Sequence, residues 1–207
     1  MVREEGLRGA RAGYDRDRRN GTGKFKGDAY IGDVSFNVWF DAILIARSIV
    51  GVRAGDIARI ARYLESREDI DYEDISILAR GEMCPVALHT AVFDESIGKI
   101  ALIEPLVSYS SIVMNQYYEP QLIHGTVPGA LTAYDLPDIA ACLAPRKLLM
   151  VNVTDQNRAR TGDEELAVVR SAYSAADAGE KLEIRSWEDE QSMDEVFSHW
   201  LRVHSQR

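Results

Sequence analysis

Aliphatic runs and helical patterns follow one another along most of the chain. Short aliphatic runs predict strands at residues 74–79, 99–106, 147–155 and 181–189. Apolar residues at helical spacing predict helices at residues 84–93, 137–144, 162–179 and 193–204. Aliphatic strands that alternate with helices are typical of a parallel sheet covered by helices on both faces. The predicted fold class is therefore α/β with a mainly parallel sheet.

Two further helices are predicted upstream of these elements. Residues 34–52 are apolar over several turns, which predicts a helix that is buried on more than one face and that ends at Gly51. Residues 53–69 predict a second, amphipathic helix. Its apolar stripe consists of Ile57, Ile60, Ala61 and Leu64.

The first 28 residues differ in composition from the rest. They are rich in Arg, Gly and Asp and contain few large aliphatic side chains. Such a segment is either a flexible leader or an arm that packs on a partner subunit. The remaining residues, 29–207, are enough for a single domain with a sizeable core.

Charge and cysteine content limit the function classes. The net charge of −9 disfavours nucleic-acid binding, because phosphates would be repelled. No apolar run is long enough to span a bilayer, and no signal-peptide core is visible near the N-terminus. Cys84 and Cys142 suggest neither a disulfide framework nor a zinc site. We therefore expect a cytoplasmic protein that is not a membrane protein.

The stretch "ISILARGEMCPVALH", residues 75–89, predicts a buried strand, a sharp turn and a helix with Pro85 in its first turn. Serine hydrolases of the α/β type carry G-x-S-x-G at such a place, with the serine on the strained turn. Here residues 79–83 contain no serine, and Gly81 and Glu82 form the centre of the turn. Because glycine tolerates strained backbone, we predict a positive φ at Gly81.

Two phrases resemble a known family. "RAGDIARIARYLESREDIDYEDISILARGE" and "YDLPDIAACLAPRKLLMVNVTD" are similar to segments of acetyl xylan esterase-like and dienelactone hydrolase-like α/β-hydrolases. The resemblance covers roughly residues 28–200 and implies a partial α/β-hydrolase fold, truncated because the early strands of the family sheet have no counterpart. In intact members it implies hydrolysis of carboxylic esters.

The resemblance also implies a degenerate catalytic triad. It places Gly81 at the nucleophile position and keeps the acid as Asp155, while the loop "WEDEQSM" after the last strand has no histidine. Triad members act as a unit, and losing a key member reduces the rate by a factor on the order of 10⁶. The serine mechanism is thereby excluded.

Other residues remain candidates for chemistry. His124 lies in a long segment, residues 107–136, in the region where the family builds its pocket, so it is a candidate catalytic residue with Asp155 and Glu104. A functional acid at the position of Glu104 is found in some relatives. We interpret His89, His199 and His204 as packing or surface residues, and Ser108, Ser110 and Ser111 as ordinary loop serines or a remote alternative nucleophile.

Acidic residues follow several predicted strands, whose carboxyl ends meet at one edge of a parallel sheet. The sequence leaves open whether they are separate solvated acids, pair with Arg80 or Arg158, share a proton, or bind a cation. Oxygen ligands suit a divalent cation such as calcium better than zinc. The acids are Glu82, Glu104, Asp155, Glu188, Asp189 and Glu190, and the candidate metal ligands among them are Glu104, Asp155 and Glu188.

Two functions follow as hypotheses. One is hydrolysis of carboxylic esters or lactones without an elbow serine, with or without a metal ion that activates water. The other is a catalytically inactive fragment of the hydrolase fold that binds a ligand or serves as a dimeric interaction module. A half-sheet leaves an apolar edge and face exposed, so we expect a homodimer in either case.

Overall fold

A computed structural model describes residues 30–31, 34–69, 75–161, 164–187, 197–198 and 200–201. The predicted leader, residues 1–28, lies outside this part of the chain. The central element is a four-stranded sheet in the order β3–β4–β5–β6, and every neighbouring pair is parallel. The predicted α/β class is confirmed, and each strand overlaps a predicted run, although β4 begins two residues earlier than predicted and β3 ends one residue later. The strands are β3 (Ile75–Arg80), β4 (Ile97–Ile103), β5 (Lys147–Val151) and β6 (Leu182–Arg185).

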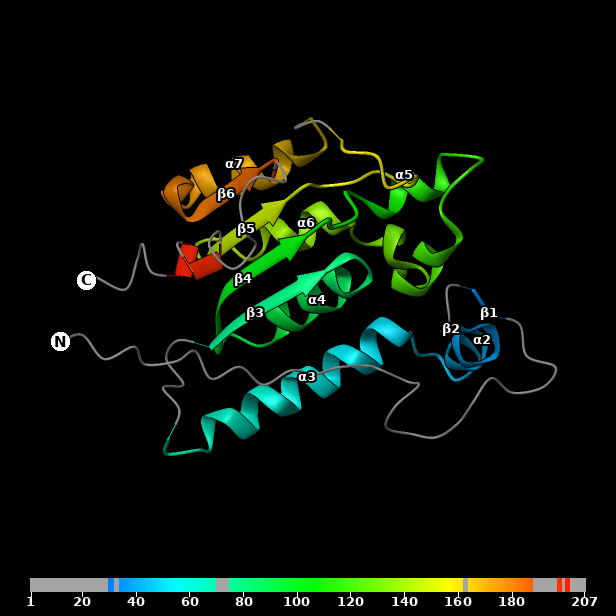
Figure 1. Cartoon of the computed structure of the whole chain (residues 1–207), viewed down its shortest axis with the longest axis horizontal. Helices are drawn as coiled ribbons and strands as arrows, with labels where there is room; N and C mark the ends of the chain where they lie inside the picture. Colours follow the sequence, from blue (N-terminus) through cyan, green and yellow to red (C-terminus); the bar gives the residue numbers. More distant parts are fainter. Residues whose placement is uncertain are drawn as a thin grey trace.

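One face of the sheet is covered by three helices and carries the main core (Figure 1). They are α4 (Cys84–Phe93), α6 (Leu136–Ala141) and α7 (Ala167–Ala175). Alternate residues of the strands point to this face. Ile100 and Leu102 of β4 are completely buried there, as is Tyr173 of α7.

The other face of the sheet packs against the C-terminal segment. Trp200, in a helical stretch near the end of the chain, is buried against Ala101, Leu149 and Val151. Lys147, at the start of β5, fixes this segment: its ammonium donates a hydrogen bond to the Trp200 carbonyl and lies 4.6 Å from the centre of the indole ring. Helical residues thus lie on both faces of the sheet, as predicted.

The upstream region contains two helices whose boundary differs from the prediction. A small antiparallel pair, β1 (Tyr30–Ile31) and β2 (Val34–Ser35), precedes α2 (Phe36–Leu44) and α3 (Ile49–Glu65). Gly51 lies inside α3 and ends no helix, so that prediction is wrong. The break comes earlier, because Ala46 has a φ of +55° and the Ser48 hydroxyl caps α3 by accepting the Gly51 N–H at 2.9 Å.

Helix α2 is the least covered apolar element of the described chain. It contains no buried residue, so the prediction of burial on more than one face is wrong for it. Phe40 is 45% exposed and Leu44 67% exposed, because α2 lies beyond the N-terminal end of α3, away from the four-stranded sheet (Figure 1). Among the described residues, no helix has the length and apolarity needed to cross a bilayer.

The long segment between β4 and α6 is built around one aspartate. It contains α5 (Tyr109–Val113) and the 3₁₀ turns η3 (Pro120–Gly125) and η4 (Ala130–Thr132). Asp135 caps α6 and also accepts hydrogen bonds from the Tyr109 and Ser110 N–H groups and from the Ser110 hydroxyl. The Ser108 hydroxyl caps α5 by accepting the Ser111 N–H at 2.9 Å. These serines therefore have structural roles.

His89 connects α4 to this segment. Its Nδ1 lies 2.6 Å from the Pro85 carbonyl oxygen, which can only accept, so Nδ1 carries the proton. Its Nε2 therefore accepts from the Tyr134 hydroxyl at 2.9 Å. The imidazole is buried, which lowers the pKa of His89 and keeps it neutral. The interpretation of His89 as a packed helix histidine agrees with these contacts.

This histidine predicts a loss of stability in mild acid. Below about pH 6.5 the unfolded chain binds a proton at His89 that the folded chain resists, so the free energy of unfolding falls as pH falls from 6.5 through the lowered pKa. We expect His89→Gln, which cannot titrate, to lose less stability than the wild type between pH 7.5 and 5.5. Urea unfolding at both pH values measures this, and equal losses would contradict the prediction.

The exposed apolar surface of α2 bears on the predicted homodimer. Contiguous apolar surface of this kind is unusual on soluble monomers. We expect sedimentation equilibrium at micromolar concentration to give about twice the 23.1 kDa chain mass. Phe40→Asp should shift the species toward monomer, whereas Tyr63→Asp, on the exposed surface of α3, should not. A wild-type monomer at that concentration would contradict the prediction.

Candidate functional site

The turn after β3 has the geometry of a nucleophile elbow. Gly81 has a φ of +54° and stands between β3 and the helix α4, which begins at Cys84 after the short turn η2 (Gly81–Met83). The predicted positive φ at Gly81 and both flanking elements are confirmed. Glycine adopts this conformation without the Cβ clash that other residues suffer.

Three neighbouring strands end in the same unusual way. Arg80, Ile103 and Val151 are the last residues of β3, β4 and β5, and they lie in register. The next residues along these strands are Gly81, Glu104 and Asn152, with φ values of +54°, +51° and +52°. Asparagine tolerates this region, but for glutamate it costs about 1 kcal/mol. All three segments therefore leave the sheet at the same level, each through a residue with a positive φ.

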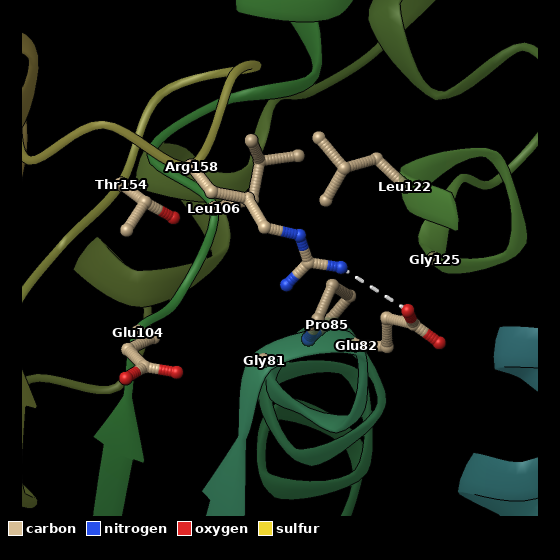
Figure 2. Close-up of a pocket in the computed structure, with 9 residues that line it drawn as sticks. All are labelled: Gly81, Glu82, Pro85, Glu104, Leu106, Leu122, Gly125, Thr154 and Arg158. Atoms are coloured by element: carbon tan, nitrogen blue, oxygen red, sulfur yellow. Dashed lines mark hydrogen bonds and ion pairs between the residues drawn. The ribbon is translucent and has the colours of Figure 1, made fainter. Parts of the chain in front are cut away.

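A pocket lies directly above this row (Figure 2). The empty space between its lining residues is about 300 Å³, a value that includes open solvent. Apolar walls come from Pro85, Leu106 and Leu122, and the charged groups come from the strand ends and their loops. The nine lining residues are Gly81, Glu82, Pro85, Glu104, Leu106, Leu122, Gly125, Thr154 and Arg158.

Arg158 occupies the space above Gly81. A Cβ atom built on Gly81 would lie 3.8 Å from the Arg158 Nη1, in ordinary van der Waals contact. Arg158 Nη2 donates to Glu82 Oε1 at 3.2 Å and to Gln121 Oε1 at 3.4 Å. Figure 2 shows the guanidinium reaching over the start of α4 toward Glu82. A cation thus lies directly above the turn at Gly81.

Glu104 lines the pocket on the other side of Gly81 from Glu82 (Figure 2). Its two carboxylate oxygens accept hydrogen bonds from Arg80 Nε at 3.0 Å and from Arg80 Nη2 at 2.9 Å. This bidentate pair raises the pKa of Arg80 through the hydrogen bonds and the carboxylate charge. The sequence left open whether an arginine, a shared proton or a cation balances the charge of Glu104. In the structure an arginine, Arg80, lies against it.

Asp155 is at the expected acid position, just beyond β5, but its carboxylate shapes its own loop. Its Oδ1 accepts the N–H groups of Asn157 at 2.8 Å and of Ala159 at 2.9 Å. The backbone N–H of Asp155 donates to the Ala159 carbonyl at 2.8 Å. These bonds close a tight turn in which Arg158 has a φ of +60°. Asp155 therefore fixes the turn that carries the arginine.

The metal hypothesis stays a prediction. Within the described residues, no three His, Cys, Asp or Glu side chains are grouped so that they could hold a metal ion. Glu104 uses both carboxylate oxygens for Arg80, and Asp155 uses Oδ1 for two backbone N–H groups. The third proposed ligand, Glu188, lies outside the described residues, as do Asp189 and Glu190.

His124 lies next to the pocket but is not part of its lining. It is only 1% exposed, inside η3, and its neighbours Leu122 and Gly125 form the wall. Tyr109 fixes this wall by donating its hydroxyl to the Gly125 carbonyl at 2.9 Å. A catalytic role for His124 stays a prediction. His199 and His204 lie outside the described residues.

Cys84, at the first position of α4, is a packing residue. It is completely buried, and its thiol donates to the Ile103 carbonyl with a sulfur–oxygen distance of 3.3 Å. Burial raises the pKa of Cys84 well above its ordinary value, so the thiol stays protonated and a poor nucleophile.

Four lining residues were not singled out from the sequence: Leu106, Leu122, Gly125 and Thr154. Leu106 and Thr154 follow β4 and β5 closely and pair with each other in an isolated parallel bridge. Their place after aliphatic strands is a usable signal, because ligands bind at the carboxyl ends of parallel strands. Leu122 and Gly125 come from η3 and carry no comparable signal.

Comparison with known proteins places the fold. No protein-family model matches the chain, and no curated protein matches its sequence. A Bacteroides fragilis protein described as an acetyl xylan esterase matches with 16% identity and a TM-score of 0.62, over 76% of this chain and 41% of its own. A methylesterase matches with 19% identity and a TM-score of 0.55, over 74% of this chain and 35% of its own.

These similarities show the fold and bear out the resemblance seen in the sequence. The chain shares its α/β architecture with part of each of these two structures, and it spans less than half the length of either one. Identities this low carry no activity from one protein to the other.

A serine restored at the elbow is not expected to create an esterase. In Gly81→Ser the new side chain has room beside Arg158, although the positive φ costs about 1 kcal/mol of stability. Without a base to take its proton, the hydroxyl should give at most weak turnover of p-nitrophenyl acetate. Gly81→Ala, equally strained but without a hydroxyl, is the control. Robust activity in the serine variant alone would reveal an unrecognised base, with His124 the first suspect.

Proposed function

We propose that the pocket above Gly81 binds the carbonyl end of a carboxylic ester or lactone and forms no acyl-enzyme. The observation that carries this proposal is the Arg158 guanidinium above the nucleophile-free elbow. The matched structures, described as an acetyl xylan esterase and a methylesterase, support the choice of ligand class. Since the chain spans less than half of each, the activity of the whole protein is part of the proposal.

Hydrogen-bond capacity favours an oxygen-bearing ligand. Arg158 uses Nη2 for Glu82 and Gln121, and within the described chain neither Nη1 nor Nε has a recorded acceptor. Guanidinium donors are fixed in a plane and have no acceptor capacity, so they suit a carbonyl or carboxylate oxygen. The apolar walls from Pro85, Leu106 and Leu122 suit the alkyl part of a small ester or lactone.

A second candidate function is hydrolysis by water. Glu104 favours it, because a glutamate held at a φ of +51° on the pocket wall is the kind of strained residue that clusters at functional sites. Its carboxylate would take a proton from a water molecule as the water oxygen bonds to the ligand carbonyl carbon, and Arg158 would offset the charge that develops on the carbonyl oxygen. The carbonyl would then re-form as the bond to the alkoxy oxygen breaks, and the proton on Glu104 would pass to that oxygen, which releases the alcohol and the acid. A bound divalent cation could activate the water instead, as the metal hypothesis requires.

One set of measurements separates these functions. Saturation-transfer NMR with methyl acetate and γ-butyrolactone should show binding to the wild type that is lost in Arg158→Met. It should be kept in Arg59→Met, which removes an arginine from an exposed ion pair of α3. Fluorophosphonate labelling should fail in every variant. The proposed function predicts binding without turnover, and absence of binding by both ligands would refute it.

Turnover would identify the alternatives. Hydrolysis that survives EDTA and is lost in Glu104→Gln would favour Glu104 as the base. Hydrolysis that EDTA abolishes and calcium restores would favour the metal hypothesis. The variant Asp56→Asn, which removes an exposed carboxylate of α3, is the control for Glu104→Gln.

A further inference from the structure

We infer that the pocket is a receptor for the carboxylate anion of a short aliphatic acid, and that Glu82 occupies the receptor arginine until the anion binds. The inference rests on the proposed function, because it concerns the same pocket, and it names a ligand class that the ester proposal does not contain. It makes Glu82 an internal competitor of the ligand.

The pairing between Glu82 and Arg158 is incomplete. A single carboxylate oxygen, Glu82 Oε1, meets a single nitrogen, Arg158 Nη2, at 3.2 Å, and that nitrogen also donates to Gln121 at 3.4 Å. Nη1 and Nε have no recorded acceptor within the described residues, and Nη1 faces the space above Gly81. A guanidinium matches a carboxylate best through two parallel N–H bonds, so Arg158 retains most of its capacity for an anion.

The second arginine at this end of the sheet provides the contrast. Arg80 and Glu104 make two hydrogen bonds, at 3.0 and 2.9 Å, which is the complete bidentate arrangement. Arg80 therefore has no comparable capacity for a ligand, and Arg158 is the arginine of this pocket that can receive one. Because Arg80 also balances the charge of Glu104, the charge next to Arg158 that can oppose an anion is that of Glu82.

The competing pair is easily opened. The side chains of Arg158 and Glu82 are 36% and 26% exposed, and an ion pair near the surface contributes little to stability. A ligand carboxylate that binds Nη1 and Nε must approach Glu82 and be repelled by it, or displace it from Nη2. Removal of the Glu82 charge should therefore strengthen the binding of an anion and leave the binding of a neutral ester nearly unchanged.

The pocket walls indicate what the acid carries. Pro85, Leu106 and Leu122 present apolar surface beside the guanidinium. The chemistry thus fits a monocarboxylate with a short alkyl chain, such as acetate or propionate. Such an anion is the acid half of the ester class proposed above.

The test is a titration of acetate followed by saturation-transfer NMR at constant ionic strength, with methyl acetate as the neutral comparison. Glu82→Gln should bind acetate about two- to fivefold more tightly than the wild type, the range expected for loss of one exposed competing pair. Arg158→Met should weaken acetate binding at least about tenfold. Arg158→Lys, which keeps the charge without the planar fork, should fall between Arg158→Met and the wild type.

Matched controls come from the exposed pair Asp56–Arg59 on α3, whose atoms lie 2.7 Å apart. Asp56→Asn and Arg59→Met make the same charge changes away from the pocket and should leave acetate affinity unchanged. Circular dichroism and thermal midpoints establish that each variant is folded before it is compared.

Acetate affinity that does not rise in Glu82→Gln overturns the inference, as does an equal rise for methyl acetate or for Asp56→Asn. If methyl acetate binds the wild type and acetate binds neither the wild type nor Glu82→Gln, the inference fails and the proposed function stands. If neither ligand binds, both fail. The inference is supported if Glu82→Gln binds acetate more tightly than the wild type, if Asp56→Asn does not, and if Arg158→Met loses acetate binding.

Discussion

The in-register parallel pairing of β3, β4 and β5 is the constraint on which the rest of the site depends. Because Arg80, Ile103 and Val151 lie on one row, the three chains leave the sheet at the same level. Each turns through a residue with positive φ, which directs the following loops over the strand ends. The pocket exists because those loops and η3 meet above that row.

The charged residues beyond these strands are held by one another and by the backbone of their loops. The nucleophile position is glycine, and the acid position, Asp155, closes a loop through two backbone N–H groups. That loop is further fixed where the Glu119 N–H donates to the Gln156 carbonyl at 2.8 Å. This loop holds Arg158 above Gly81. The turn after β3 thus has a guanidinium above it and no serine in it.

Apolar side chains are buried on both faces of the sheet but not on α2. Between the sheet and α4, α6 and α7 lies a continuous buried core, and Trp200 covers the opposite face beside β4 and β5. Leu78, on β3 at the edge of the described sheet, is 57% exposed, and α2 buries no side chain. The apolar side chains of α2 are therefore the ones that a further polypeptide surface would remove from water.

The sequence by itself determined the succession of strands and helices along the chain, the α/β class and the turn at Gly81. These follow from local apolar periodicity and from the conformational freedom of glycine. It failed at Gly51 and at α2. Serine capping at residue 48 outweighed the weak helix-breaking tendency of a glycine, and burial of α2 requires a neighbour that periodicity cannot supply. Only the tertiary structure decided which arginine meets which acid. Arg158 and Glu82 are separated by 76 residues and Arg80 and Glu104 by 24, and such pairs form only where strand register and loop closure bring the side chains together.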